Sequence, residues 1–214
     1  MINKNVPFYP NTEDDTHCYQ AALKMLLKYY FPDKEYSLEE LEKFSAKKEG
    51  LSTWPTQAYM NLLKMGFEII DMDEFDNQRF IKEGESYLIE KFGEEVAKWQ
   101  VQMSDLEQER RLMEEYETYH KHQFRLPDIE DIKKTLDQGF LVMCTVNSEV
   151  LNHKSGYIGH IVLIYGYDDN NLYLHDPGLP PVEARKISFE EFKKAWESPN
   201  EGARNMAAFK YDKN

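Results

Sequence analysis

Apolar residues begin to recur at helical spacing directly after a polar N-terminal segment. Residues 1–17 include two prolines and a run of polar residues, which disfavour regular structure. From Cys18 to Tyr29 the apolar positions follow at i, i+3, i+4, i+7, i+8 and i+11, as in an amphipathic helix. This pattern predicts a helix that begins at Cys18 and ends before Pro32, with one of the polar residues 14–16 as its N-cap.

Two more helices and a short strand are predicted before residue 72. Ser37 and Glu40 have the spacing of a capping box, so a second helix should begin after Ser37. Residues 56–64 are expected to form a third helix that ends near Gly66. A strand is expected at 67–71.

Residues 78–123 combine helical apolar spacing with many charges. The apolar positions in this segment are Leu88, Phe92, Val96, Trp99, Met103, Leu106, Met113 and Tyr116. They predict one or two amphipathic helices, broken at Gly93. We expect this helical insertion to pack on the core or to form the seam of a homo-oligomer. The Trp99, Met103, Leu106 stripe is interpreted as packing and not as a ligand groove.

The C-terminal third of the chain predicts mainly strands. Strands are expected at 140–146, 159–166, 172–175 and 206–211, and helices at 128–137 and 188–196. Helices therefore come first and an antiparallel sheet comes last, which predicts an α+β fold. We expect residues 1–214 to form a single domain that contains the 78–123 insertion.

Composition and charge restrict the class of protein. The chain has 214 residues, 41% of them hydrophobic, enough to bury a sizeable core. The net charge is 26 − 39 = −13, which argues against nucleic acid and anionic membrane as partners. We also expect no secretory signal and no membrane span, since no apolar run is long enough.

The chain contains two cysteines, Cys18 and Cys144. Two cysteines in a chain of this size do not suggest a disulfide framework, and they fit a reducing, cytoplasmic location. A single Cys18–Cys144 bridge is the less favoured alternative. Cys144 lies within an apolar strand and is expected to be a buried structural residue.

Three residues form a candidate catalytic set. Cys18 opens a helix, where the helix dipole favours a thiolate. His160 begins an apolar strand and needs a polar partner. If the hairpin loop is centred near Asp168, Asp176 lies directly opposite His160, whereas a loop centred on Asn170 shifts that register. A carboxylate on one imidazole nitrogen would leave the other nitrogen as a base.

A family resemblance rests on motifs at both ends of the chain. These motifs are Val6-Pro7-Phe8 ahead of Cys18, the stretch from Gly159 to Tyr167, and His175-Asp176-Pro177-Gly178. They resemble the bacteriocin-processing (double-glycine leader) peptidase-like group of the papain-like cysteine peptidase superfamily. The resemblance does not cover residues 78–123.

The resemblance implies a papain-like fold and a peptidase-like hydrolase. Cys18 would be the nucleophile, His160 the base and Asp176 the group that orients the base. The substrate would be a peptide or another amide, cleaved through a thioester, with no metal or organic cofactor. The family typically has a Gln about six residues before the cysteine. This chain has Thr12 at that position, and the neighbouring Asn11 is the candidate oxyanion donor.

Other interpretations remain open. An acyltransferase or transpeptidase could use the same scaffold, and an inactive site would make the protein a binding module that works through residues 78–123. His17 is expected to face solvent or to contact the helix cap, and His175 to point to the opposite face of its strand from Asp176. The Glu117-x-x-His120 pair is a weak metal motif, and a structural role for it is favoured.

Overall fold

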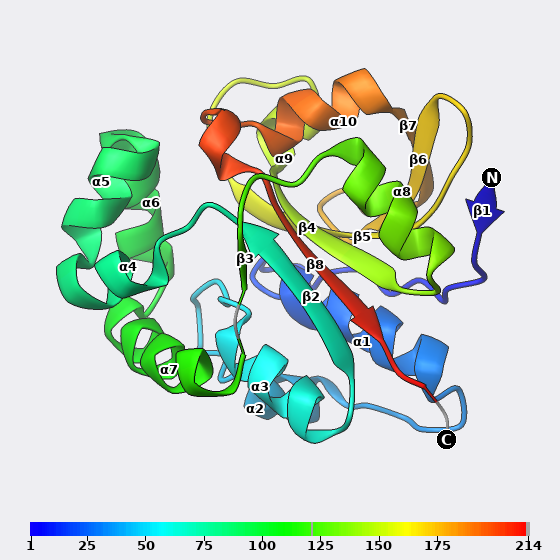
Figure 1. Ribbon diagram of the computed structural model, residues 1–214, viewed down its shortest axis with the longest axis horizontal. Coiled ribbons are helices and arrows are strands. Elements are labelled where there is room, and N and C mark those ends of the chain that lie inside the picture. The colour runs from blue at the N-terminus through cyan, green and yellow to red at the C-terminus, as the bar shows by residue number, and fades with distance from the viewer. Residues whose placement is uncertain (121, 213–214) are drawn as a thin grey trace.

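A mixed sheet forms the centre of the molecule (Figure 1). The computed structural model describes residues 1–120 and 122–212. Among these residues the strand order is β3-β2-β8-β4-β5-β6-β7, and β1 pairs with β5. The strands are β1 (Ile2–Asn3), β2 (Glu68–Asp73), β3 (Gln123–Phe124), β4 (Leu141–Asn147), β5 (Gly159–Tyr167), β6 (Asn171–Asp176), β7 (Val182–Ser188) and β8 (Asn205–Lys210). The β2–β3 pair is parallel and the other pairs are antiparallel.

Helices cover both faces of this sheet and one of its ends (Figure 1). On one face lie α1 (Cys18–Tyr30), α2 (Leu38–Phe44) and α3 (Thr56–Lys64). On the other face lie α8 (Ile129–Asp137), α9 (Ser148–Leu151) and α10 (Phe189–Trp196). Beyond the sheet end lie α4 (Asn77–Glu83), α5 (Glu85–Phe92), α6 (Glu94–Met103) and α7 (Leu106–Tyr119). A short 3-10 turn, η1 (Glu201–Ala203), precedes β8.

Alternating side chains of the central strands divide the core in two. In β4, Leu141 and Met143 pack with α1 and α3, whereas Val142 and Cys144 pack with α8 and α10. Both faces of this strand are buried, which explains why it is an uninterrupted apolar run in the sequence. The α1 helix is fixed to the sheet at its far end, where the Tyr30 hydroxyl donates to the Phe209 carbonyl at 2.8 Å.

The helices α4–α7 bury a hydrophobic cluster of their own. Its fully buried members are Phe80, Tyr87, Leu88, Ala97 and Met113. The sequence predicted one or two helices here, but the described residues form four between positions 77 and 119. Gly93 does separate two helices, and Gly84 separates two more. Both glycines have positive φ values, 87° and 58°, which end a helix readily.

Most predicted elements agree with the structure, but the start of α1 differs. The α+β class is confirmed, as is the capping box of Ser37 and Glu40. None of residues 14–16 caps α1, because the residue before the helix is His17, whose side chain makes no capping bond. Instead Asp14 accepts hydrogen bonds from the backbone N–H and the hydroxyl of Thr16 within a tight turn.

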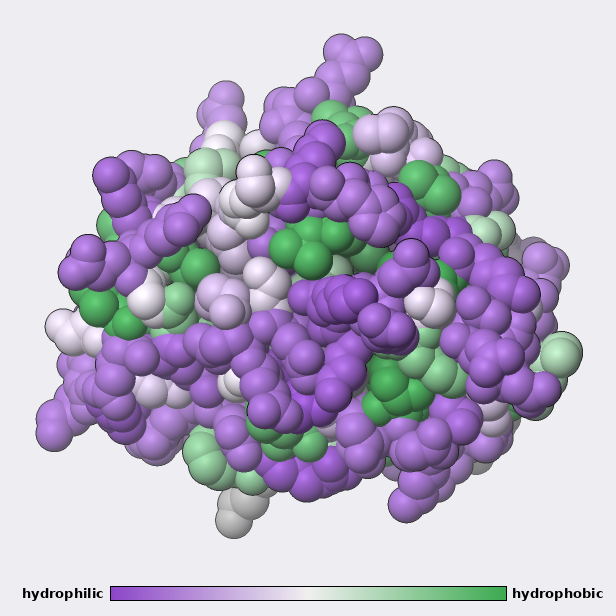
Figure 2. All heavy atoms as spheres, turned by 90° about the horizontal axis from the view of Figure 1, so that it is seen from above, coloured by the Kyte–Doolittle hydropathy of each residue, from purple (hydrophilic) through white to green (hydrophobic). Residues whose placement is uncertain are grey.

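The molecular surface is mainly hydrophilic. Figure 2, which views the molecule from the side of α8 and α10, shows separated hydrophobic patches between polar and charged side chains. No helix within the described part of the chain has the length and apolar character needed to cross a bilayer.

Candidate active site

The fold brings Cys18, His160 and Asp176 together from three separate elements. Cys18 is the first residue of α1, His160 is the second of β5, and Asp176 is the last of β6. His160 Nε2 lies 2.7 Å from Asp176 Oδ1, and the two residues are 4% and 1% exposed. The Cys18 thiol lies beside the same ring, since its interaction with His160 shifts the pKa of both groups. Since Nε2 is engaged by the carboxylate, Nδ1 is the nitrogen left for the thiol.

The His160–Asp176 pair forms by a diagonal contact and not by direct opposition. β5 and β6 pair Leu163 with His175 and Ile164 with Leu174, and the register shifts beyond Ile164. Continuing the Leu163–His175 register places Asp176 beside Val162, two residues from His160. The expectation that Asp176 lies directly opposite His160 is therefore wrong. Diagonal neighbours are still within reach of long side chains, so the contact survives.

Asp176 is held by two groups in addition to His160. The Gly178 N–H donates to Oδ1 at 3.0 Å, and Arg185 Nη2 lies 3.0 Å from Oδ2. Arg185 is itself anchored, because its guanidinium donates to the Leu151 carbonyl at 3.0 Å and to Asn152 Oδ1 at 2.8 Å. Arg185 was not among the predicted site residues, because no strand was predicted at 182–188.

The pKa shifts of Cys18, His160 and Asp176 favour the ionised form of each side chain. Burial would raise the pKa of Cys18, but the hydrogen bond and charge of His160 outweigh it and lower that pKa. Burial would lower the pKa of His160, yet its hydrogen bonds to Asp176 and Cys18 raise it to about 10. Burial also opposes ionisation of Asp176, and the hydrogen bond and charge of His160 keep its pKa below the ordinary value. The site therefore favours a thiolate, an imidazolium and a carboxylate.

A side chain at position 178 should disrupt this arrangement. A Cβ added to Gly178 would lie 3.0 Å from Asp176 Oδ1 and 3.2 Å from His160 Nε2, so these two atoms would have to shift by a few tenths of an ångström. We expect Gly178→Ala to slow alkylation of Cys18 at pH 7 by roughly 10-fold or more, because overpacking of this kind costs about 1–3 kcal/mol. The measurement is the rate of iodoacetamide labelling. Gly50→Ala is the control, since Gly50 has a φ of 72° but no neighbour near the added Cβ. It should reduce stability without slowing the labelling.

Asn11 ties the segment before Cys18 to the loop after Asp176. Its backbone N–H donates to the Pro177 carbonyl at 2.8 Å. Its side-chain oxygen accepts the N–H groups of Thr12 at 2.9 Å and His17 at 2.8 Å. Asn11 Nδ2 donates one hydrogen to Asp15 Oδ1 at 2.7 Å and keeps a second hydrogen. Asn11 therefore has a structural role that leaves one amide donor for a ligand.

Asp15 adds negative charge beside the candidate nucleophile. Burial raises the pKa of Asp15, and its charge raises the pKa of Cys18. We expect Asp15→Asn to lower the pKa of Cys18, and so to speed its alkylation at a pH below that pKa by roughly 2- to 5-fold. Glu13→Gln, an exposed charge in the same segment, should have a much smaller effect. Equal pH profiles of alkylation for wild type and Asp15→Asn would contradict this prediction.

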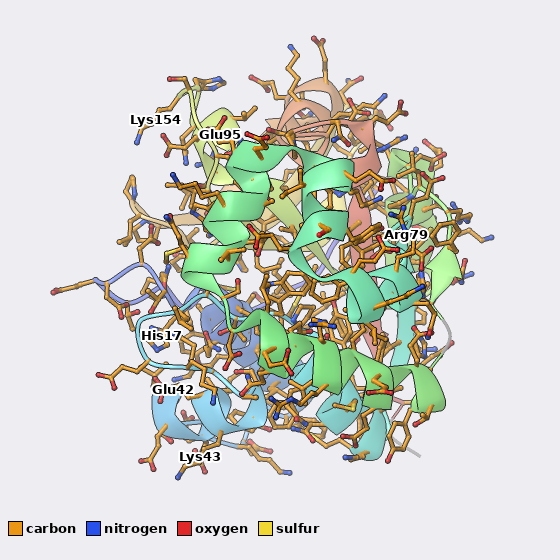
Figure 3. All side chains as sticks on the ribbon, turned by 90° about the vertical axis from the view of Figure 1, so that its left-hand side faces the viewer. His17, Glu42, Lys43, Arg79, Glu95 and Lys154 are labelled. Carbon is orange, nitrogen blue, oxygen red and sulfur yellow. The ribbon has the colours of Figure 1, made fainter. Side chains whose placement is uncertain are left out.

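The other histidines and the second cysteine lie outside the catalytic set. His17 is buried and not solvent-facing as expected: its Nε2 is 2.8 Å from Glu42 Oε1 (Figure 3). His175 donates from Nε2 to the Val6 carbonyl at 2.9 Å and accepts the Ala184 N–H at Nδ1. Cys144 is fully buried, which raises its pKa well above the usual value, and both cysteines are free thiols.

The Glu117-x-x-His120 motif serves the packing of α7. Glu117 Oε1 accepts a hydrogen bond from Asn77 Nδ2 at 2.7 Å and lies 3.8 Å from His122 Nδ1. The described residues contain no group of three or more histidine, cysteine or acidic side chains arranged to hold a metal ion.

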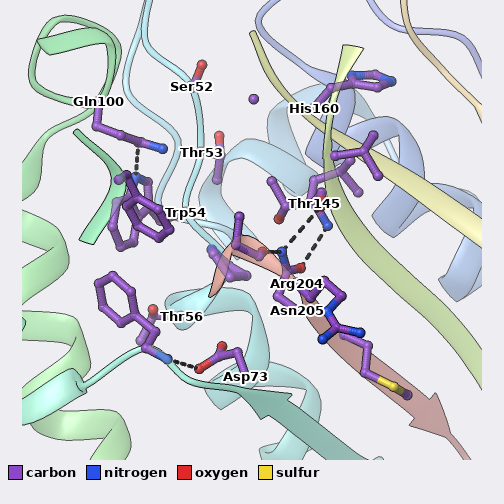
Figure 4. Close-up of a pocket in the computed structure, with 18 of the residues that line it drawn as sticks. Ser52, Thr53, Trp54, Thr56, Asp73, Gln100, Thr145, His160, Arg204 and Asn205 are labelled. Atoms are coloured by element: carbon purple, nitrogen blue, oxygen red, sulfur yellow. Dashed lines mark hydrogen bonds between the residues drawn. The ribbon is translucent and has the colours of Figure 1, made fainter. Parts of the chain in front are cut away.

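A cavity of about 220 Å³ adjoins Cys18 and His160 (Figure 4). Its aromatic lining residues are Trp54, Tyr59, Phe75, Phe92, Trp99, Tyr116 and Tyr157. The helices α4, α5, α6 and α7 contribute one wall. The other walls come from the 52–55 loop, the first turns of α1 and α3, the ends of β2, β4, β5 and β8, and the segment around η1. Trp99 packs so closely on Gly159 that an added Cβ would lie 3.1 Å from its ring. Trp99 therefore lines a cavity, contrary to the interpretation of its stripe as packing alone.

Comparison with known proteins identifies the family. The model of the Peptidase_C39 like family matches residues 3–203. A C39-like peptidase from Bacillus anthracis is 15% identical, with a TM-score of 0.51 and coverage of 100% of this chain and 98% of that one. The peptidase domain of Streptococcus ComA, a bifunctional ABC transporter involved in quorum sensing, is 16% identical, with a TM-score of 0.49 and coverage of 96% and 97%. A search of curated proteins found no significant match. The chain belongs to the Peptidase C39-like family and has its papain-like fold.

Proposed function

We propose that the protein is a cysteine-dependent hydrolase that cleaves a peptide or another amide bond. The observation that carries this proposal is that Cys18 and His160 line one cavity, where His160 bonds to Asp176 and lowers the pKa of Cys18. A nucleophile, a base and an orienting group within hydrogen-bond reach form the usual signature of covalent catalysis. The two free thiols support a reducing, cytoplasmic location.

The geometry supports a two-step acyl transfer. The Cys18 thiolate attacks the substrate carbonyl carbon, and the resulting oxyanion accepts hydrogen bonds from the first N–H groups of α1 and from the second Asn11 Nδ2 hydrogen. The His160 imidazolium then gives its proton to the departing amine, which leaves a thioester on Cys18. Water attacks the thioester while His160 accepts its proton, and the acid product and the thiolate are released. Throughout this cycle Asp176 holds the His160 ring in one orientation.

Thiol labelling tests the nucleophile directly. Iodoacetamide near neutral pH should alkylate Cys18 rapidly, while Cys144 provides an unreactive internal reference because it is fully buried. Cys18→Ala should abolish hydrolysis of a peptide library and the rapid labelling together. Slow and equal labelling of the two thiols in the native protein would contradict the proposal and favour an inactive binding module. Added amines that compete with water for the acyl group would instead indicate a transferase.

A further inference from the structure

The far end of the cavity contains two carboxylates. Asp71 and Asp73 both line it, and they lie two residues apart on β2, so their side chains share one face of the strand. Neither residue belongs to the proposed catalytic set. Figure 4 shows Asp73 on the opposite side of the cavity from His160.

The sheet register gives the span from the catalytic strand to these carboxylates. Asp73 pairs with Asn205 on β8, and Thr145 on β4 pairs with Ile161 on β5. The Asn205 side chain links these two pairs, because its Oδ1 accepts the Thr145 N–H at 2.8 Å. Asp73, Asn205, Thr145 and Ile161 therefore lie in one row across β2, β8, β4 and β5. Three strand spacings correspond to roughly 14 Å. A peptide segment with one extended lysine or arginine side chain can bridge that distance, because each extended residue advances about 3.3 Å.

The walls between the two ends suit an apolar stem with a cationic tip. Trp54 and Phe75 contact each other in a T-shaped arrangement with centroids 6.0 Å apart, and Trp99 meets Tyr157 in the same way at 5.6 Å. These rings offer apolar surface to the methylene groups of a long side chain. Aromatic faces also attract cations through their quadrupoles.

The cations that line the cavity already have partners elsewhere. Lys91 Nζ donates to the Glu74 carbonyl at 2.6 Å, and Arg204 Nη2 lies 2.5 Å from Glu201 Oε1. Among the described residues, no lysine or arginine nitrogen lies within 4.0 Å of either cavity carboxylate. Asp73 Oδ1 accepts the Phe75 N–H at 2.7 Å and lies 3.8 Å from the His122 ring, and the charge of Lys91 acts on it from farther away. Asp71 accepts the Tyr116 hydroxyl at 3.1 Å.

Two further observations favour the binding of a peptide at this site. Burial first, and then the charge of Asp73, raise the pKa of Asp71 to about 8, as expected for a carboxyl group without a counter-ion. Arg204 lines the same cavity and is 9% exposed, yet its Nε has no hydrogen-bond partner among the described residues and lies 3.7 Å from Glu197. A peptide carbonyl is an acceptor that would satisfy this donor.

We propose that the cavity binds a peptide segment of the substrate that carries a lysine or arginine side chain within three residues of the bond that Cys18 attacks. The cationic tip lies between Asp71 and Asp73, the stem lies along the aromatic wall, and a peptide carbonyl accepts from Arg204 Nε. This inference rests on the proposed hydrolase function and adds the class of its substrate.

Matched covalent probes test the proposal. The probes are tripeptidyl chloromethyl ketones that carry lysine, or its uncharged isostere norleucine, at the first, second or third residue from the reactive group. At each position the two probes differ only in the ammonium group. At one position the lysyl probe should inactivate Cys18 at least 10-fold faster than the norleucyl probe. Equal rates at all three positions, with rapid iodoacetamide labelling of Cys18 retained, would overturn the cationic pocket and leave the hydrolase intact. Slow labelling of Cys18 by iodoacetamide as well would instead overturn the hydrolase proposal itself.

Variants that remove one carboxylate each test whether Asp71 and Asp73 recognise the lysyl ammonium. Asp71→Asn and Asp73→Asn should bring the ratio of lysyl to norleucyl rates close to 1, because only the lysyl probe carries the charge that these carboxylates attract. Urea unfolding of each variant reports whether the fold is intact. Glu74→Gln, an exposed charge directly after β2, should keep the wild-type ratio. A ratio that survives in both Asp variants, or that falls equally in Glu74→Gln, would contradict the assignment of these carboxylates.

Discussion

Alkylation of Cys18 at pH 6 should slow by about 100-fold or more when His160 is replaced by alanine. A thiol of ordinary pKa near 8.5 is ionised to only about 0.3% at this pH. In the wild type the hydrogen bond and charge of His160 lower the pKa of Cys18, so the thiolate persists to lower pH. The variant loses this effect while burial still raises the pKa, so its labelling rate should rise only at higher pH and approach the wild-type rate near pH 10.

The pH profile separates this effect from general damage to the fold. His153→Ala is a suitable control, since His153 is an exposed histidine outside the site, and it should keep the wild-type profile. If His160→Ala labels at pH 6 as fast as the wild type, His160 does not ionise Cys18 and the catalytic assignment is wrong.

Removal of the Asp176 side chain should reduce both stability and activity. Asp176 is 1% exposed and contacts both His160 and Arg185, so Asp176→Ala leaves the buried His160 and the partly buried Arg185 without their carboxylate partner. Loss of one member of a buried ion pair typically costs about 3–5 kcal/mol of unfolding free energy. Activity should fall by roughly 10²- to 10⁴-fold, because the imidazole loses its orientation and its proton affinity. Urea unfolding and peptide hydrolysis provide the two measurements.

The stability lost in Asp176→Ala should depend on pH, because the pKa of Asp176 differs between the folded and unfolded protein. Its pKa is lowered in the folded protein, so its contribution to stability is present above the unfolded pKa of about 3.9 and is lost as pH falls through the lower folded value. The difference in stability between wild type and Asp176→Ala should therefore shrink in acid. Glu190→Ala removes an exposed partner of Lys194 and should leave stability nearly unchanged. An equally small effect of Asp176→Ala would contradict a buried ion-pair network.

Local signals explain which parts of the fold the sequence predicted. The capping box of Ser37 and the amphipathic spacing after Cys18 depend on residues a few positions apart, and both were recognised. β7 was missed because Val182–Ser188 is polar and mostly exposed, and Ala184 within it has a φ of 54°. Because β7 was not predicted, the contact of Arg185 with Asp176 was not predicted either. That contact follows only from the pairing of β7 with β6.

The candidate site was predictable only in part, for a physical reason. The sequence indicated Cys18, His160 and Asp176 through a helix start, a strand start and a strand end, and the fold brings these three residues together. The register between β5 and β6 depends on an irregularity beyond Ile164 that the loop residues did not reveal. The contact of Trp99 with Gly159 joins residues far apart in the chain, and helical periodicity carries no information about which surface a helix meets.

The separate hydrophobic cluster of α4–α7 allows one wall of the cavity to vary independently of the sheet. These helices bury side chains mainly among themselves, while Trp99 and Phe92 still shape the wall of the cavity. The proposed nucleophile and base lie on α1 and β5, and Asp71 and Asp73 lie on β2, so α4–α7 contribute a wall of the cavity but none of these four residues. Exchange of residues 77–119 between homologues should therefore reshape this wall while the proposed catalytic residues and the two carboxylates stay in place.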